Sequence, residues 1–384
     1  MAVRHRGVRT LAAVALLAPA SAAAQKVPVV QLKPADAKLD EEFTSLGDVR
    51  ELKDGRVLVS DLRENKLVVA DLRTGKLEVI GRVGSGPGEF RRPGPMFALG
   101  GDSTLLSDSG NRRWLLLDGA RIVGMVPPET PAITGVRGFA MGADVRGRAL
   151  GVLPAGRRGG DPSGPLDSAF VVLVSRSTGK ADTVARLRPP STGVTRMIKG
   201  PDGREIPLSM VPPLATPEHA ILFPDGWLAI ARLEPYRVDW RTPEGRIILG
   251  AALPVPSVRM DDREKRAYLA RFARLSGRPP ADPSSRDDWP ETIPAFSALM
   301  GYGPVLFASP DGRVLVQRTP TASHEEPLYD VVDRGGKLTG RLSLPANQKI
   351  VGFGTKAVYV AVTDDDGIER LRRHPWPAER PIAP

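Results

Sequence analysis

The chain has no cysteine, only four histidines and few aromatic residues, which occupy 5% of its 384 positions. Without cysteine there can be no disulfide, thiolate metal site, thiol nucleophile or lipid anchor on a cysteine. The histidines lie too far apart in the sequence to suggest a paired metal site. No segment after the first 24 residues approaches 18 consecutive apolar positions, so the sequence predicts no transmembrane helix.

The first 24 residues have the three parts of a secretory signal peptide. Arginines at positions 4, 6 and 9 precede the apolar run Thr10–Ala20, and small residues at positions 22–24 precede Gln25. A basic start, a short apolar core and a small-residue cleavage site are typical of export signals. We predict a signal peptide over residues 1–24, cleaved near Ala24, and a mature protein that is periplasmic or secreted.

The formal net charge is +10, and three of these charges lie in the predicted signal peptide, which leaves +7 for residues 25–384. A positive surface favours anionic partners in general. The basic residues alternate with acidic ones instead of forming runs, which is not typical of nucleic-acid binding. Export also argues against nucleic acid, so we expect none as a partner.

What the sequence does contain is glycine and proline, 40 and 38 residues, between short apolar runs. This pattern predicts an all-β fold with many short strands. One unit recurs, and its clearest copy comprises Asp54–Asp61, Asn65–Asp71 and Thr74–Ile80. Further copies begin at Gly101, Arg146, Asp225, Asp311 and Gly354.

The six anchors are 47, 45, 79, 86 and 43 residues apart. Three of these spacings match a four-stranded propeller blade of about 40–50 residues, and insertions account for the other two. We predict a six-bladed β-propeller over residues 25–384, with a hidden seventh blade as the main alternative. The last copy lacks an outer strand, and we expect Val27–Leu32 to supply it and close the ring.

Two segments resemble the NHL repeat. Ser107–Arg113 is similar to its Asp-containing turn, and Gly84–Phe90, followed by Pro93, is similar to its Gly-rich connector. Asp61–Lys66 is a weaker copy of the turn. The resemblance covers the first two blades and implies a bacterial exported six-bladed propeller. The motif residues suit tight turns, and the phosphate-loop alternative for Gly84–Gly88 lacks the required pattern.

Three long segments fall on one face of the predicted ring. Pro154–Ser168 joins the second and third strands of blade three, Arg188–Ala220 joins blades three and four, and Pro254–Phe296 joins blades four and five. In a propeller these connections share a face, which we call the insertion face. Function tends to lie on elaborated loops carried by a rigid scaffold, so we predict the interaction surface here, near blades three to five.

One of these insertions contains the single helix that the sequence predicts. Asp261 can cap its N-terminus, with Glu264 three residues later, and Gly277 can end it. An apolar stripe follows the helical spacing: Tyr268, Leu269, Phe272 and Leu275. We expect the stripe to pack on the top of blade four or five, with a partner-binding or membrane-surface helix as the alternative.

Candidate ligand-binding residues lie in the same segments. Glu218 and His219 stand where the inner strand of blade four should begin, and could act in acid–base chemistry or hold a ligand. The competing interpretation is a polar strand start with a solvated histidine. Other basic and aromatic candidates, suited to an anionic ligand or a sugar, are Arg157, Arg158 and Arg204, with Arg196 and Lys199 nearby, and Trp289 and Tyr302.

These patterns favour a non-enzymatic binding or scaffold propeller that presents blades three to five to an envelope or extracellular protein, peptide or glycan. We assign no catalytic or metal-binding residue, expect no cofactor and expect a monomer. The alternative is a metal-dependent enzyme resembling gluconolactonase-like hydrolases or amidating lyases, with calcium at the channel mouth. The first of these groups holds its metal with inner-strand Glu, Asn and Asp residues. Here Glu218 is the only acid at such a place, and inner-strand asparagines are missing.

Overall fold

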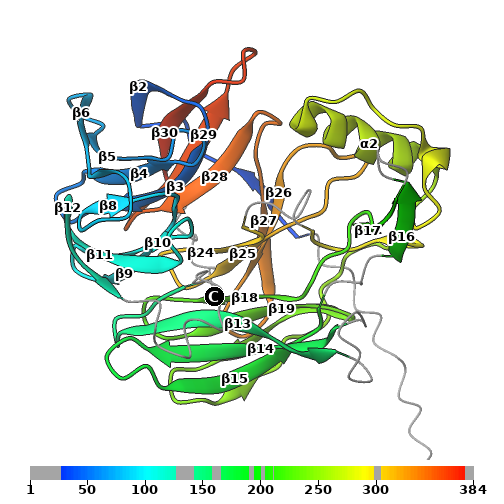
Figure 1. The fold of residues 1–384 in the computed structure, drawn as a ribbon, viewed down its shortest axis with the longest axis horizontal. Helices are drawn as coiled ribbons and strands as arrows, with labels where there is room; N and C mark the ends of the chain where they lie inside the picture. Colours follow the sequence, from blue (N-terminus) through cyan, green and yellow to red (C-terminus); the bar gives the residue numbers. More distant parts are fainter. Residues whose placement is uncertain are drawn as a thin grey trace, which may run out of the picture.

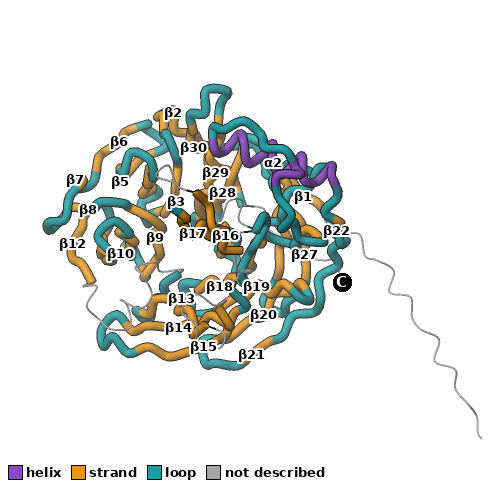
Figure 2. The backbone as a smooth tube through the Cα atoms, turned by 45° about the vertical axis from the view of Figure 1, so that its right-hand side comes forward, coloured by secondary structure: helices purple, strands orange, loops and turns teal. Residues whose placement is uncertain are grey.

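The structure is a computed structural model, which describes residues 27–126, 142–157, 166–189, 194–199, 204–210, 212–297 and 304–376. The described strands form small sheets of two to five strands, and the larger sheets are arranged around a central axis. The ring is apparent in Figure 2, where the sheets follow one another around the centre. This is the predicted six-bladed propeller.

The first two blades are regular four-stranded antiparallel sheets, with the strand nearest the axis first in the chain. Blade one contains β3 (Leu46–Glu51), β4 (Val57–Asp61), β5 (Lys66–Asp71) and β6 (Lys76–Val79). Blade two contains β9 (Pro93–Gly100), β10 (Ser103–Asp108), β11 (Arg113–Asp118) and β12 (Arg121–Val126). A short parallel pair, β7 (Arg82–Val83) and β8 (Glu89–Phe90), connects them.

Blades three and four carry the same order. Blade three contains β13 (Arg148–Arg157), β14 (Leu166–Ser175) and β15 (Ala181–Leu187). Its inner position is marked by isolated bridges from Gly142 to Leu222 and from Ala143 to Ala149. Blade four contains β18 (His219–Leu222), β19 (Leu228–Leu233), β20 (Tyr236–Arg241) and β21 (Ile247–Ile248).

The last two blades also include the N-terminal strands. Blade five contains β24 (Leu306–Ala308), β25 (Val314–Gln317), β26 (Leu328–Val332) and β27 (Leu338–Ser343), with β1 (Val29–Gln31) parallel to β27. Blade six contains β28 (Gln348–Phe353), β29 (Ala357–Thr363), β30 (Glu369–Pro375) and β2 (Ala37–Phe43). An N-terminal strand therefore closes the ring, as predicted.

The strand that completes blade six differs from the one we expected. Ala37–Phe43 pairs antiparallel with β30, whereas Val29–Gln31, from the segment Val27–Leu32, lies outside blade five. The reason is connectivity: β2 leads directly into β3, and Asp61 Oδ2 accepts the N–H of Thr44 at 2.7 Å in the turn between them. Val29–Gln31 instead adds a strand to the outer edge of blade five, beside β27.

The glycine anchors of the repeat form one recurrent turn between the first and second strands of a blade. In blade one, Leu52 N–H donates to Arg56 O at 2.8 Å, and Gly55 N–H donates to Leu52 O at 3.0 Å. Gly55 has a φ of 85°, which favours glycine. The same two-bond pattern recurs in blades three, four and five, with its glycines at Gly147, Gly226 and Gly312.

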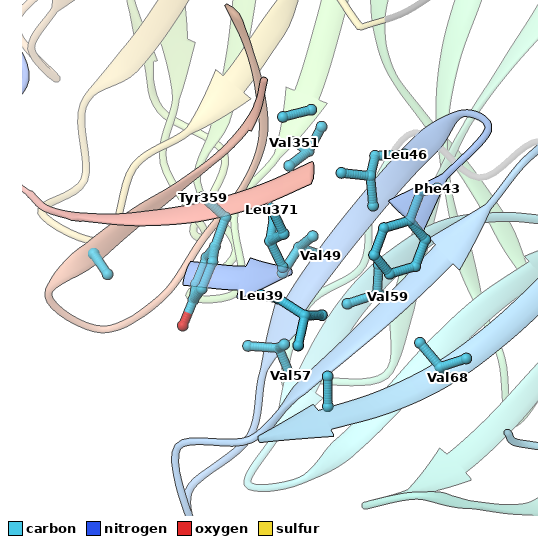
Figure 3. Close-up of a cluster of buried hydrophobic side chains, with 13 residues drawn as sticks. Leu39, Phe43, Leu46, Val49, Val57, Val59, Val68, Val351, Tyr359 and Leu371 are labelled. Carbon is cyan, nitrogen blue, oxygen red and sulfur yellow. The ribbon is translucent and has the colours of Figure 1, made fainter. Parts of the chain in front are cut away.

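Alternate residues of one strand pack into opposite seams between blades. Val57 and Val59 of β4 face blade six, while Leu58 faces blade two. Figure 3 shows the seam between blades six and one, where Leu39 and Leu371 meet the valines of blade one. Among the described residues each of the six seams between blades has such a buried cluster.

Candidate functional site

The insertions project from one face of the ring. The connection from β15 to β18 contains the hairpin β16 (Val194–Lys199) and β17 (Glu205–Met210). The connection from β21 to β24 contains β22 (Val258–Arg259), α2 (Asp262–Ser276), η2 (Pro283–Ser285) and β23 (Thr292–Ile293). Figures 1 and 2 together place β16, β17 and α2 on the same side, with β16 and β17 in front of the ring centre. Of the predicted loop Pro154–Ser168, the first four residues belong to β13 and the last three to β14, and the residues between them lie outside the described part of the chain.

The predicted helix is present, and its cap has the expected geometry. Asp261 accepts the N–H of Glu264 at 2.9 Å, and Gly277 ends the helix in the left-handed conformation. Acceptance of an otherwise unpaired N–H by the first side chain is the usual way to begin a helix. Together these residues fix both ends of α2.

The apolar stripe of α2 does not pack on the top of a blade, so this expectation was wrong. Tyr268 and Leu269 are buried against Leu214 of the neighbouring insertion and against Met260 and other residues of their own. The insertions from either side of blade four are long enough to meet above it, and they form a small core of their own. Leu275, at the end of the stripe, is exposed.

Polar contacts anchor α2 to the loop between the second and third strands of blade five, Arg318–Pro327. Glu264, which is buried, accepts the N–H of Ala322 at 2.8 Å, and Arg271 Nη2 donates to Pro320 O at 3.1 Å. Charge-assisted hydrogen bonds of this kind are stronger than neutral ones. The helix, the two insertions and this loop are therefore held as one unit.

Beneath this unit lies a cavity of about 630 Å³ between blades four and five. Its walls come from the two insertions, the tight turn after β19 and the loop of blade five. The volume lies within the range of typical ligand pockets, roughly 300–1,000 Å³. The lining includes six prolines: Pro189, Pro212, Pro213, Pro256, Pro290 and Pro294.

The polar floor of the cavity centres on Arg318. Its Nε donates to Ala295 O at 2.7 Å, and its guanidinium carbon lies 5.9 Å from the centre of the Tyr236 ring. Tyr236 donates its hydroxyl to the fully buried Asp330 at 2.9 Å, and Arg341 Nε donates to the same carboxylate at 2.9 Å. Burial raises the pKa of Tyr236 well above its usual value, so this hydroxyl stays protonated.

Two ion pairs lie at the rim of the cavity. Arg188 Nη1 lies 2.7 Å from Glu234 Oε2, and Arg286 Nη2 lies 2.7 Å from Asp288 Oδ2. The hydrogen bond to Glu234 raises the pKa of Arg188, so this side chain is charged at any physiological pH. Glu291 is exposed at the rim.

Glu218 is held by hydrogen bonds from backbone and side-chain groups of the scaffold. Its buried carboxylate accepts the N–H of Arg188 at 2.9 Å and Arg232 Nη1 at 2.7 Å. Arg232 also donates to Asp239 at 3.0 Å. Both bonds to Glu218 go to Oε2, and they tie the exit of blade three to blade four.

His219 lies beside the cavity, next to Thr216, which lines it. Its Nε2 is 3.5 Å from Thr216 Oγ1, and its ring meets Phe296 edge-on at 5.9 Å between centroids. Burial lowers the pKa of His219 to about 4, so the ring is neutral near pH 7. The side chain of His219 is partly exposed, and a role of this residue in binding stays a prediction.

The other candidates are only partly placed. Arg204 is exposed beside β17, while Arg157 ends β13 on the insertion face. Arg158 and Tyr302 lie outside the described residues. Trp289 packs within its own insertion: its indole N–H donates to Pro283 O at 3.1 Å and its ring meets Tyr268 edge-on. A role of these side chains in binding stays a prediction.

The NHL-like segments form a closed hydrogen-bond network between blades one and two. The fully buried carboxylate of Asp108 accepts the backbone N–H groups of Arg91 and Arg92 at 3.0 and 3.1 Å. It also accepts Asn111 Nδ2 at 2.7 Å and Arg113 Nε at 3.2 Å. Asn111 and Arg113 in turn donate to carbonyls of the Gly-rich connector. The motif residues thus hold the connector in place.

Sequence reasoning did not find Arg318, Thr319 or Tyr236, which line the cavity. One signal was available. The anchor at Asp311 places the second strand of blade five at Val314–Gln317, and the loop that follows runs ten residues, from Arg318 to Pro327. That is longer than the two-residue turn between β19 and β20, and it could have marked the loop as elaborated.

Within the described part of the chain no helix is long and apolar enough to cross a membrane. The same residues contain no cluster of three or more His, Asp or Glu side chains placed to hold a metal ion.

No family model matches the chain, and no curated protein matches its sequence. Among solved structures, it is similar to a calcium-binding protein, regucalcin, from Agrobacterium tumefaciens, at 13% identity and a TM-score of 0.36, over 92% of this chain and 98% of that one. A member of the DUF4221 family from Bacteroides vulgatus gives 9% identity and a TM-score of 0.44, over 89% and 94%. A streptogramin B lyase gives 10% and 0.40, over 89% and 86%. At these identities the likeness reaches no further than the fold.

Proposed function

We propose that this chain is an exported binding propeller that holds a protein, peptide or glycan ligand on its insertion face. The observation that carries the proposal is the cavity of about 630 Å³ between blades four and five. It is lined by the longest insertions of the chain, and rigid scaffolds commonly carry their binding sites on such loops. The prolines of its lining restrict the backbone and favour a preformed site.

The export signal and the NHL-like turn support the wider assignment to bacterial exported propellers of that group. Cleavage near Ala24 would leave Gln25 as the first residue of the mature protein. Expression with the native N-terminus in a bacterial host, followed by mass determination of the mature chain, tests this part. Retention of the first 24 residues by an envelope-located protein would contradict it.

Ser257 offers a way to test the binding site. It is exposed and lines the cavity, so a tryptophan at this position should fill the entrance without disturbing the core. Thr74, exposed in a turn on the opposite face of blade one, gives a matched control. We expect ligands found by screening peptide and oligosaccharide arrays to bind the native protein and Thr74→Trp, and to be lost from Ser257→Trp. Ligands that bind all three proteins equally would contradict the proposed site.

A further inference from the structure

The floor of the cavity contains a buried hydroxyl group without a partner. Thr319 lines the cavity and is 5% exposed, yet no described residue accepts or donates a hydrogen bond at its Oγ1. Its backbone N–H is already used, donating to Ala295 O at 3.1 Å. Buried polar groups without a partner are uncommon in folded proteins because each one loses its bonds to water. A hydroxyl group in this position is suited to a ligand.

Arg318 lies next to it in the chain and lines the same cavity. Its Nε is fixed by Ala295 O at 2.7 Å, and Nη1 lies 3.5 Å from Asp330 Oδ2. The structure shows no hydrogen bond from Nη2 to any described residue. The Arg318 side chain is 15% exposed, and its guanidinium is held at one edge by the protein while Nη2 remains available.

The charge of this floor is positive. The single carboxylate of Asp330 serves both Arg318 and Arg341, and the Tyr236 hydroxyl that also bonds it is neutral. The cluster therefore holds two positive charges and one negative charge. At the rim, Glu234 and Asp288 each have an arginine partner, and Glu291 carries one further negative charge. Of the two arginines at the floor, Arg318 is the one that lines the cavity, so an anionic group there would meet its guanidinium.

The walls above the floor are aliphatic. Leu214, Val255, Ile293 and Ala295 line the cavity together with the prolines. Tyr236 is the only aromatic residue among the described lining, and Arg318 lies over its ring. Sugars commonly bind by stacking on aromatic faces, whereas aliphatic walls suit an apolar side chain. This lining favours a peptide over a glycan.

We infer that Arg318 and Thr319 bind the C-terminal carboxylate of a peptide whose last, apolar side chain occupies the aliphatic part of the cavity. Arg318 Nη2 and the Thr319 hydroxyl supply two donors, and capture of a terminal carboxylate is a recurrent mode of peptide recognition. The inference rests on the proposed function, because it takes the cavity as the binding site. It deepens that proposal by naming the ligand's chemistry and the two residues that recognise it.

A pair of probes isolates the carboxylate. Dansyl-Gly-Ala-Val-Leu with a free C-terminus and the same peptide with a C-terminal amide differ only at the group in question. We expect the acid to bind at least tenfold more tightly in a fluorescence titration against the full mature protein. Ser257→Trp should weaken both peptides, because it blocks the cavity they share.

Thr319→Val tests the hydroxyl, with Thr319→Ser as the conservative control. Valine has the shape of threonine without its donor, so the preference for the acid over the amide should fall at least threefold, while serine should keep it. Because the hydroxyl has no partner in the free protein, Thr319→Val should unfold at the same temperature as the native chain or higher. A melting experiment on both variants thus separates loss of recognition from loss of folding.

The outcomes distinguish the two proposals. If acid and amide bind equally and Ser257→Trp weakens both, the carboxylate anchor is overturned while the cavity remains the binding site. If tetragalacturonate binds and neither peptide does, the peptide assignment is overturned in favour of an anionic glycan. A Thr319→Val protein with an unchanged acid preference would also overturn the role of the hydroxyl.

Discussion

The backbone N–H of Leu46 donates a 2.6 Å hydrogen bond to Glu369 Oε2, which joins the first strand of blade one to the third strand of blade six across 323 residues of sequence. The other carboxylate oxygen lies 2.8 Å from Lys349 Nζ in the inner strand of blade six. The bond is buried at the seam where the two ends of the propeller meet. Ring closure thus depends on a side chain as well as on the pairing of β2 with β30.

Removal of this carboxylate should weaken the closure. In Glu369→Ala the buried N–H of Leu46 loses its acceptor, which costs about 1–3 kcal/mol of unfolding free energy. Urea denaturation followed by tryptophan fluorescence measures the change. Glu78→Ala, at an exposed position in the outer strand of blade one, is the control and should be close to neutral. Equal stability of the two variants would show that the bond contributes nothing to closure.

Asp108 should contribute more to the stability of the protein than its position in a turn suggests. Its carboxylate and Arg113 are both buried, so Asp108→Ala leaves an unpaired buried charge and several unpaired N–H groups. Breaking a buried pair in this way typically costs about 3–5 kcal/mol. We expect a loss of that order in chemical denaturation. Asp54→Ala, which removes an exposed pair with Arg56, should change little. A small effect of Asp108→Ala would contradict the structural role of the NHL-like turn.

The repeat could be predicted from sequence because each turn is determined locally. Asp54–Gly55 and Asp311–Gly312 belong to the same five-residue backbone pattern, in which glycine takes a positive φ. Such a turn is recognisable without knowledge of the rest of the fold. The spacing of these turns then gives the number of blades.

Contacts between segments far apart in the sequence could not be predicted in this way. Val27–Leu32 is more apolar than Ala37–Phe43, yet the second segment closes blade six, because only Leu39 and Phe43 of that strand need to be buried. The floor of the cavity depends on Arg318 meeting Ala295 and Asp330, which come from other parts of the chain. Sequence therefore predicted the face that carries the cavity, and not the residues that form it.

Asp48 should make the protein less stable as the pH rises. It accepts the N–H of Met96 in the next blade at 2.6 Å, and burial raises its pKa to about 7 despite the opposing effects of this hydrogen bond, that of Val49 and nearby Arg50. Because the folded protein binds this proton more tightly than the unfolded chain, the stability that the proton provides is full below about pH 4 and is lost as the pH rises to about 7. The loss is at most about 4 kcal/mol.

Asp48→Asn removes this titration and keeps an oxygen that can accept the Met96 N–H. We expect the unfolding free energy of Asp48→Asn to fall less between pH 4 and pH 7 than that of the native chain. Asp40→Asn, at an exposed position in β2, is the control and should follow the native curve. Parallel curves for the native protein and Asp48→Asn would contradict the shifted pKa.

His219 should make the protein less stable as the pH falls, over nearly the same pH range as Asp48. Its pKa is lowered by burial to about 4, so the unfolded chain binds this proton more tightly than the folded one. The stability contributed by the neutral ring is therefore full above about pH 6.5 and is lost as the pH falls towards 4, by at most about 3 kcal/mol. His219→Gln, which is neutral throughout, should lose less stability on acidification than the native chain.

In the native protein the effects of Asp48 and His219 on the unfolding free energy offset each other between pH 4 and 7. Each single variant should therefore make this free energy depend on pH, while the double variant Asp48→Asn/His219→Gln should restore a nearly constant value. Denaturation of all four proteins at four pH values measures this, and single-variant curves that tilt in the same direction would refute the assignment of opposite shifts.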